Sequence, residues 1–229
     1  MNRLFCFLFL FLLFSGTSCL NRQLDEEGVN PDTIYFDYKI TANESDDNLT
    51  VMLQYRDGED GDAIAIKEPG AVLLDGEPMS ATNTKMSGTF YEVHKPIAAF
   101  AGKHNIVFRT IDKKEYKEEF NFRPVSLSTA FADTFRRNDL ALELDGLDTA
   151  DFIRVLMTDT SFKNEGINRV DKVLNGRLVI TKADLENLAN GPIQLEFIRE
   201  YERSVKNGTE EGGRLQITYS IKREFFLKD

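Results

Sequence analysis

Apolar and polar residues alternate with a period of two along the chain from about residue 34, a pattern that predicts β-strands. The segments whose alternate apolar residues share a face are Ile34–Ile40, Leu49–Tyr55, Ile64–Ile66, Ile106–Thr110 and Tyr116–Phe122, with shorter runs at Val72–Leu74 and Phe90–Val93. Polar turns separate them, including the hairpin dipeptide Asp75-Gly76 and the triplet Asp112-Lys113-Lys114. Seven or eight short strands with frequent turns predict a β-sandwich over residues 32–123.

The pattern restarts beyond Pro124, which we take as the boundary between two units. Leu140–Leu144 alternates, Phe152–Met157 is an apolar-rich strand, and Asn175-Gly176 is a type I′ hairpin signal between two further strands. Two long alternating segments follow, Ile193–Tyr201 and Leu215–Ile221. The predicted fold is all-β, with two tandem immunoglobulin-like β-sandwich domains at residues 32–123 and 124–229.

One segment departs from the strand pattern and predicts a short helix over Thr181–Ala189. Thr181 can cap it with Asp184 at the third helical position, and Gly191 and Pro192 stand beyond its end. Leu185 and Leu188 would then close one end of the second sandwich.

The first nineteen residues read as an export signal. Met1–Arg3 is a short basic start, residues 4–14 are unbroken apolar, residues 15–18 are small, and Cys19 follows directly. The apolar run is shorter than the roughly 20 residues that span a bilayer. We predict a signal peptide over residues 1–18, lipid on Cys19 and a polar tether over residues 19–31. The alternative is a soluble secreted protein that happens to begin with cysteine.

The composition of the chain limits the classes of partner that it could bind. The only cysteines are Cys6 and Cys19, so the mature chain would have no disulfide and would depend on core packing. A net charge of −10 argues against nucleic acid and against electrostatic docking on anionic lipid. The chain lacks Trp, so a glycan-binding surface would use Tyr or Phe instead.

Gly16-Thr17-Ser18-Cys19, the acidic tether and the two sandwich units together resemble the uncharacterised envelope lipoproteins of Gram-negative bacteria with tandem immunoglobulin-like domains. The resemblance implies an exported protein anchored by lipid on Cys19, in the outer membrane. It is architectural and implies no active site.

Two acidic clusters are candidates for metal binding. Asp57, Glu59, Asp60 and Asp62 are interleaved with glycine and could surround Ca²⁺, which prefers several oxygen ligands; the alternative is a polar hairpin loop. The second series is Asp145, Asp148 and Asp151, which we expect to line a loop, with Asp148 or Asp151 capping a turn. No other cofactor is expected.

No motif for nucleophilic catalysis or phosphate binding is present, and His94 and His104 alone cannot form a zinc site. We therefore predict no enzymatic activity and a binding role toward an envelope protein or a glycan, with no nucleic-acid partner. The alternatives are a glycan-binding module and a hydrolase that uses paired carboxylates, which sequence alone does not exclude.

Overall fold

The computed structural model describes residues 24–25, 28–161 and 165–229, and strands dominate it. In chain order they are β1 (Leu24–Asp25), β2 (Ile34–Asn43), β3 (Asn48–Asp57), β4 (Ile64–Ala65), β5 (Ala71–Leu74), β6 (Glu77–Pro78), β7 (Ala81–Thr84), β8 (Gly88–Pro96), β9 (Gly102–Arg109), β10 (Glu115–Phe122), β11 (Ser126–Leu127), β12 (Thr134–Arg136), β13 (Leu140–Asp145), β14 (Ala150–Asp159), β15 (Ile167–Leu174), β16 (Arg177–Ile180), β17 (Gly191–Ser204) and β18 (Gly213–Lys228). The helical segments are the 3₁₀ turns η2 (Pro31–Thr33) and η3 (Ile97–Ala99) and the helix α1 (Lys182–Glu186). The predicted all-β class is confirmed. Among the described residues, no helix is long and apolar enough to cross a membrane.

The period-two pattern places the core as predicted. The alternating residues of β2 and β3 are all buried: Ile34, Phe36, Tyr38, Ile40, Leu49, Val51, Leu53 and Tyr55. Both predicted hairpin dipeptides form tight turns with positive φ at each residue, 54° and 84° at Asp75-Gly76 and 50° and 75° at Asn175-Gly176. In β14 the apolar run alternates too, because Ile153, Val155 and Met157 point inward while Phe152 is 57% exposed.

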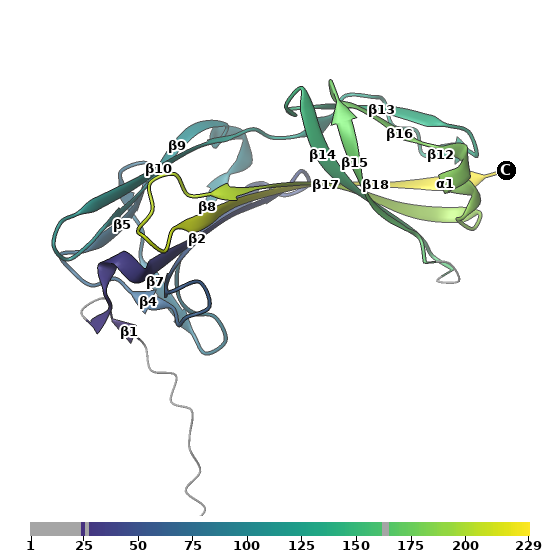
Figure 1. Ribbon diagram of the computed structural model, residues 1–229. Helices are drawn as coiled ribbons and strands as arrows, with labels where there is room; N and C mark the ends of the chain where they lie inside the picture. Colours follow the sequence, from purple (N-terminus) through teal and green to yellow (C-terminus); the bar gives the residue numbers. More distant parts are fainter. Residues whose placement is uncertain (1–23, 26–27, 162–164) are drawn as a thin grey trace, which may run out of the picture.

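The last two strands connect the two halves of the molecule. β17 and β18 pair over their whole length, from Gly191↔Leu227 to Ser204↔Arg214. The first half of β18 also pairs in parallel with β2, while β17 pairs with β14 and the end of β18 with β12. We call residues 191–228 the shared hairpin. The first lobe is residues 28–123 with residues 200–220, and the second lobe is residues 124–199 with residues 221–228 (Figure 1).

Each lobe has two layers, and the shared hairpin belongs to the same layer in both. One sheet continues through β7, β8, β3, β2, β18, β17, β14 and β15. In the first lobe the sheet β10-β9-β5-β6 covers it, with the Phe122 ring 6.1 Å from that of Tyr219. In the second lobe β16 leaves β15 after the pair Leu174↔Arg177 and joins β13, and Figure 1 shows β13 and β16 apart from the plane of the shared hairpin. The residues of β18 that point into both cores have one parity: Leu215, Ile217, Tyr219, Ile221, Phe225 and Leu227. Both covering layers therefore lie on one face of the hairpin.

A buried ion pair fixes the shared hairpin to the first lobe. Asp37 of β2 stands opposite Arg214 of β18, and its carboxylate accepts from Nε at 2.9 Å and from Nη2 at 3.2 Å. Lys39 Nζ lies 3.1 Å from the same carboxylate, whose side chain is 2% exposed. Burial alone would raise the pKa of Asp37, but the hydrogen bonds from Arg214 and Lys39 outweigh it and lower the pKa below the usual aspartate value.

This lowered pKa predicts an acid-dependent contribution to stability. The contribution is complete above the pKa of an unfolded aspartate, about 3.9, and is lost as the pH falls through the lower folded value. We expect Asp37→Asn to lower the free energy of unfolding at pH 7 by about 1.5–3 kcal/mol, the worth of hydrogen bonds to a charged group. The variant should lose less stability than the wild type below pH 4. Urea melts at several pH values measure both effects, and parallel pH curves for the two proteins would contradict the assignment.

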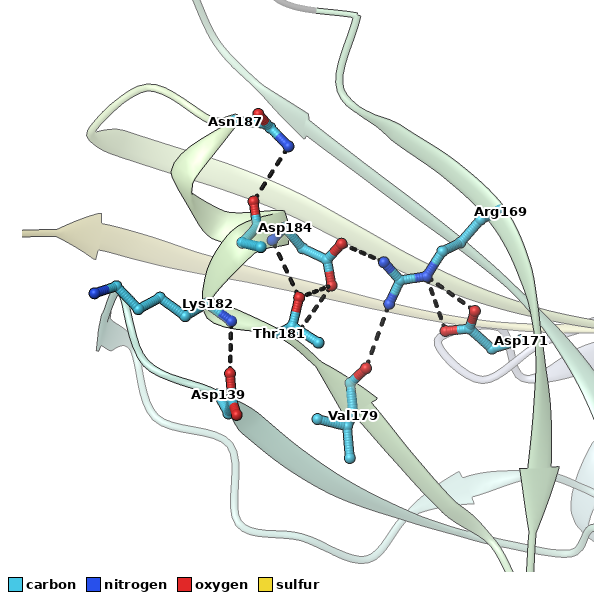
Figure 2. Close-up of polar contacts among 9 residues, drawn as sticks. Asp139, Arg169, Asp171, Val179, Thr181, Lys182, Asp184 and Asn187 are labelled. Atoms are coloured by element: carbon cyan, nitrogen blue, oxygen red, sulfur yellow. Dashed lines mark hydrogen bonds and ion pairs between the residues drawn. The ribbon is translucent and has the colours of Figure 1, made fainter.

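The predicted helix forms with its predicted cap. Thr181 Oγ1 accepts from the Asp184 N–H at 3.2 Å, and Asp184 Oδ2 accepts from the Thr181 N–H at 2.7 Å (Figure 2). Arg169 of β15 contacts Asp184 and Asp171. Burial raises the pKa of Asp184, but the hydrogen bonds from Arg169 and Thr181 give a net lowering.

The helix is shorter than predicted, because α1 ends at Glu186 and not at residue 189. Arg137 explains how so short a helix is held, since its guanidinium donates to the carbonyls of Leu185 and Leu188 and to Asn190 Oδ1. Leu185 and Leu188 are both buried, so they close the end of the second lobe as predicted.

The division into domains at residue 124 stays a prediction. The structure adds that a single hairpin supplies strands on both sides of it. The predicted tether overlaps the fold at its end, because β1 pairs with β4 and Val29 is buried. The predicted signal peptide lies outside the described residues.

Candidate functional site

A concave feature with a volume of about 550 Å³ lies between the lobes. Its floor is the stretch of the covered face of the shared hairpin that lies between the two covering layers. The strands β9 and β10 and the β5–β6 turn form one wall, and the segments beside Arg123 and Asp148 form the other. We call this the inter-lobe groove, and its lining residues are Asp75, Lys103, His104, Asn105, Glu119, Phe120, Asn121, Arg123, Asp148, Arg199, Tyr201, Arg203, Lys206 and Ile217.

The floor consists of alternate residues of β17. Ile193, Leu195 and Phe197 point into the second core, and Arg199, Tyr201 and Arg203 continue the same face. The Tyr201 ring is 37% exposed, and the Arg199 guanidinium lies 5.8 Å from its centroid. The apolar face of the strand thus becomes an amphipathic surface where the covering layers end.

Two aspartates hold Arg199 in position. Asp151 Oδ2 accepts from Nε at 2.8 Å, and Asp148 Oδ2 accepts from Nη2 at 3.3 Å. Asp148 also forms an ion pair with Arg123. Its carboxylate therefore links Arg199 on the floor to the segment that connects the two lobes. The Arg199 side chain is only 10% exposed, yet Nη1 keeps its N–H groups free among the described residues. A ligand in the groove would meet a guanidinium that is already oriented.

Arg203 is held in a similar way by a buried carboxylate of the first lobe. Glu118 of β10 is 1% exposed, and its Oε1 lies 2.6 Å from Arg203 Nη2. Glu118 Oε2 accepts from the Lys206 N–H at 2.7 Å. Arg203 Nη2 also donates to the Glu119 carbonyl at 2.8 Å. These contacts tie the groove floor to the edge of β10.

The wall of the first lobe is built around His104. Its Nδ1 lies 2.8 Å from Asp75 Oδ2, its Nε2 lies 2.8 Å from the Phe100 carbonyl, and its ring stacks on Phe100 at 3.6 Å. Asp75 also accepts from the Asn105 N–H, which fixes the β5–β6 turn against β9. Lys103, beside His104, also lines this wall. The wall is therefore polar and held together by hydrogen bonds.

The structure brings together part of the second acidic series. Asp148 and Asp151 meet at Arg199, whereas Asp145 ends β13. Asp151 Oδ1 also accepts from the N–H of Phe152 at 2.9 Å, within β14, and the predicted turn-capping role stays a prediction. The side chain that contacts both carboxylates is Arg199.

The predicted calcium loop is a closed turn at the end of β3. The Asp57 N–H donates to the Asp62 carbonyl at 3.0 Å, and Asp57 Oδ1 accepts from Thr33 Oγ1 at 3.0 Å. Across the described residues, no three side chains of His, Cys, Asp or Glu gather as a metal site would require. Calcium binding by Asp57, Glu59, Asp60 and Asp62 stays a prediction, and the structure adds no ligand geometry to it.

Three further residues were considered in the sequence, Cys19, His94 and His104. Cys19 is outside the described residues. His94 is exposed on β8, where Nδ1 lies 3.1 Å from Thr50 Oγ1. His104, predicted to be an ordinary histidine, is in the groove wall. The floor residues Arg199 and Arg203 were missed, although two arginines on the apolar face of a long strand are a signal that the sequence contains.

Comparison with known proteins gives neither a matching family model nor a matching curated protein. Solved structures match this chain with low sequence identity and low TM-scores. The two-domain IG1+IG2 structure of DIP-gamma is 10% identical over 82% of this chain and 97% of that chain, with a TM-score of 0.22. SGBP-B from the Bacteroides ovatus mixed-linkage glucan utilization locus, in complex with a heptasaccharide, is 13% identical over 90% of this chain and 46% of that chain, with a TM-score of 0.23.

The Yersinia pseudotuberculosis adhesin InvE is 13% identical over 83% of this chain and 60% of that chain, with a TM-score of 0.24. Likeness at this level carries no inference about a ligand, which has to come from the side chains of this chain.

Proposed function

We propose that this protein is an exported, non-enzymatic lipoprotein of the cell envelope that binds a glycan in the inter-lobe groove. The sequence leaves protein and glycan open as partners, and the groove favours the glycan. Its concave shape suits a chain-like polar ligand more than a flat protein surface. Lipid on Cys19 would hold the groove near the membrane.

The observation that carries this proposal is Tyr201 on the groove floor. A sugar ring has an apolar C–H face and a rim of hydroxyl groups, so it needs an aromatic surface beside planar hydrogen-bonding groups. Tyr201 offers a partly exposed ring next to Arg199. Asn105, Glu119 and Asn121 supply donors and acceptors along the wall.

The carboxylates of the groove support a binding role over hydrolysis. A glycosidase needs one protonated carboxylic acid and one carboxylate flanking the scissile bond. Here Asp148, Asp151 and Glu118 each contact an arginine of the groove floor, so these carboxylates serve to position arginine side chains.

A glycan array followed by calorimetric titration of the best ligand tests the proposal. Tyr201→Ala should weaken binding about tenfold, since an aromatic contact contributes about 0.5–1.5 kcal/mol beyond its buried area and 1.4 kcal/mol is a factor of ten. Phe226→Ala is the matched control, because Phe226 is 45% exposed on β18 but does not line the groove. Equal losses in both variants, no glycan ligand at all, or turnover of the ligand would contradict the proposal.

The proposed lipid anchor on Cys19 is tested by a separate measurement. Mass spectrometry of the mature N-terminus should find Cys19 as the first residue and carrying lipid, because Cys19 directly follows four small residues. An unmodified Cys19, or cleavage at another position, would contradict the lipoprotein assignment and leave the glycan proposal standing.

A further inference from the structure

Strand β15 has one side without a strand partner. It pairs with β14 along its length, from Met157↔Ile167 to Ala150↔Leu174. On its other side it pairs with β16 only at Leu174↔Arg177, because β16 departs to pair with β13. Among the described strands, none covers that side of residues 167–172. An uncovered strand edge presents backbone N–H and C=O groups to any strand that can align with it.

Large apolar side chains gather beside this free edge. Val170 and Leu174 of β15 are 51% and 54% exposed, and Phe152 of β14 is 57% exposed. Phe152 stands opposite Lys172, so Val170 and Leu174 are its diagonal neighbours on the outer face of the sheet. An apolar strip therefore runs up to the edge and would continue across a strand added there.

We propose that two copies of this chain pair antiparallel through β15, about a twofold axis at Val170. This joins the two large sheets edge to edge and places the two apolar strips side by side. The interface is isologous, as in most homodimers, because the same strand is used by both copies.

The charges of β15 select this register over its neighbours. When the outer faces of the two sheets form one continuous surface, the twofold axis passes through one residue of β15. That residue then stands opposite the same residue of the other copy. An axis at Arg169, Asp171 or Lys172 places two like charges opposite each other, which destabilises a pair of strands. An axis at Val170 places valine against valine, Arg169 against Asp171 of the other copy, and Asn168 against Lys172. Opposite charges and apolar side chains thus meet in one arrangement only.

The contact is small. A single pair of edge strands buries less than a standard protein–protein interface, so the dimer should depend on concentration. Each copy carries a net charge of −10, and this repulsion also keeps the association weak at low salt. Sedimentation of the purified chain should show a monomer–dimer equilibrium that shifts toward dimer as concentration rises. Val170→Lys should abolish it by placing two lysines at the axis.

Cysteine cross-linking tests the register itself. Replacing Cys6 and Cys19 with serine removes both native thiols. In that background Val170→Cys should form a disulfide-linked dimer on mild oxidation, because the two residues face each other. Lys172→Cys is the matched control, since it would face Asn168 of the other copy, and its cross-linking should be at least tenfold slower.

Both substituted side chains are on the exposed outer face, and circular dichroism verifies that the variants fold. A wild-type chain that stays monomeric at all concentrations would overturn the proposal. So would a dimer that survives Val170→Lys, or equal cross-linking at positions 170 and 172. Glycan binding in the groove is unaffected by any of these outcomes.

Discussion

Replacing Arg203 with methionine is expected to lower the free energy of unfolding by about 3–5 kcal/mol, the cost of leaving a buried charge without its partner. Glu118 is 1% exposed, and Arg203 Nη2 lies 2.6 Å from its Oε1. Once Arg203 is lost, the backbone N–H of Lys206 is the one hydrogen-bond donor to the carboxylate that remains among the described residues. For a chain of this size the loss should lower the melting temperature by about 10 °C.

The double variant Arg203→Met with Glu118→Leu separates the buried charge from the loss of packing. Removing both charges leaves no unpaired charge buried at this position, so the double variant should recover most of the lost stability. Denaturant melts of the four proteins form a double-mutant cycle. If the two single losses simply add in the double variant, Arg203 and Glu118 do not form the buried pair described.

Replacing Gly213 with alanine is expected to be comparably severe. Gly213 begins β18 with φ of +154°, and a Cβ there would lie 2.4 Å from the Phe36 carbonyl oxygen and 2.6 Å from the Phe36 Cβ. Phe36 is 1% exposed and packs against Tyr38, Tyr55, Phe108 and Tyr116. Overpacking costs about 1–3 kcal/mol and a strained φ about 1–3 kcal/mol, so we expect a total of about 2–6 kcal/mol.

Gly212→Ala is the control for this prediction. Gly212 has φ of +79°, but a Cβ there would meet no atom within 4 Å, so only the backbone strain applies. Thermal melts of both variants should show the larger loss at Gly213. Equal losses would mean that β18 does not approach β2 as closely as the structure has it.

Local patterns predicted the strands that bury one face. β2, β3, β10 and β13 follow alternation that can be read from neighbouring residues alone, and Asn175-Gly176 specified its turn by positive φ. The capping box of α1 was equally local. β7 and β12 had no such signal, because Ala81–Thr84 is exposed throughout and Thr134–Arg136 has one apolar residue.

The shared hairpin and the groove could not be predicted, because they depend on contacts distant in sequence. β17 and β18, with 14 and 16 residues, give an ordinary alternating pattern whichever lobe they join. Only the register with β2 assigns half of β18 to the first lobe. Asp151 is 48 residues from Arg199, and no local pattern pairs them. Glu118 on the apolar face of β10 indicated that a buried partner was needed, but the sequence did not identify Arg203 as that partner.

The most direct test of glycan recognition in the inter-lobe groove is amide NMR of the protein titrated with its best glycan ligand. Glycan binding in the groove should give chemical-shift changes concentrated at residues 103–105 and 119–121 of the wall and at residues 199–203 of the floor, so that both lobes respond to one ligand. Changes confined to other surfaces, such as β14 and β15 or the loop at residues 57–62, would contradict it, and so would the absence of any change at saturating glycan.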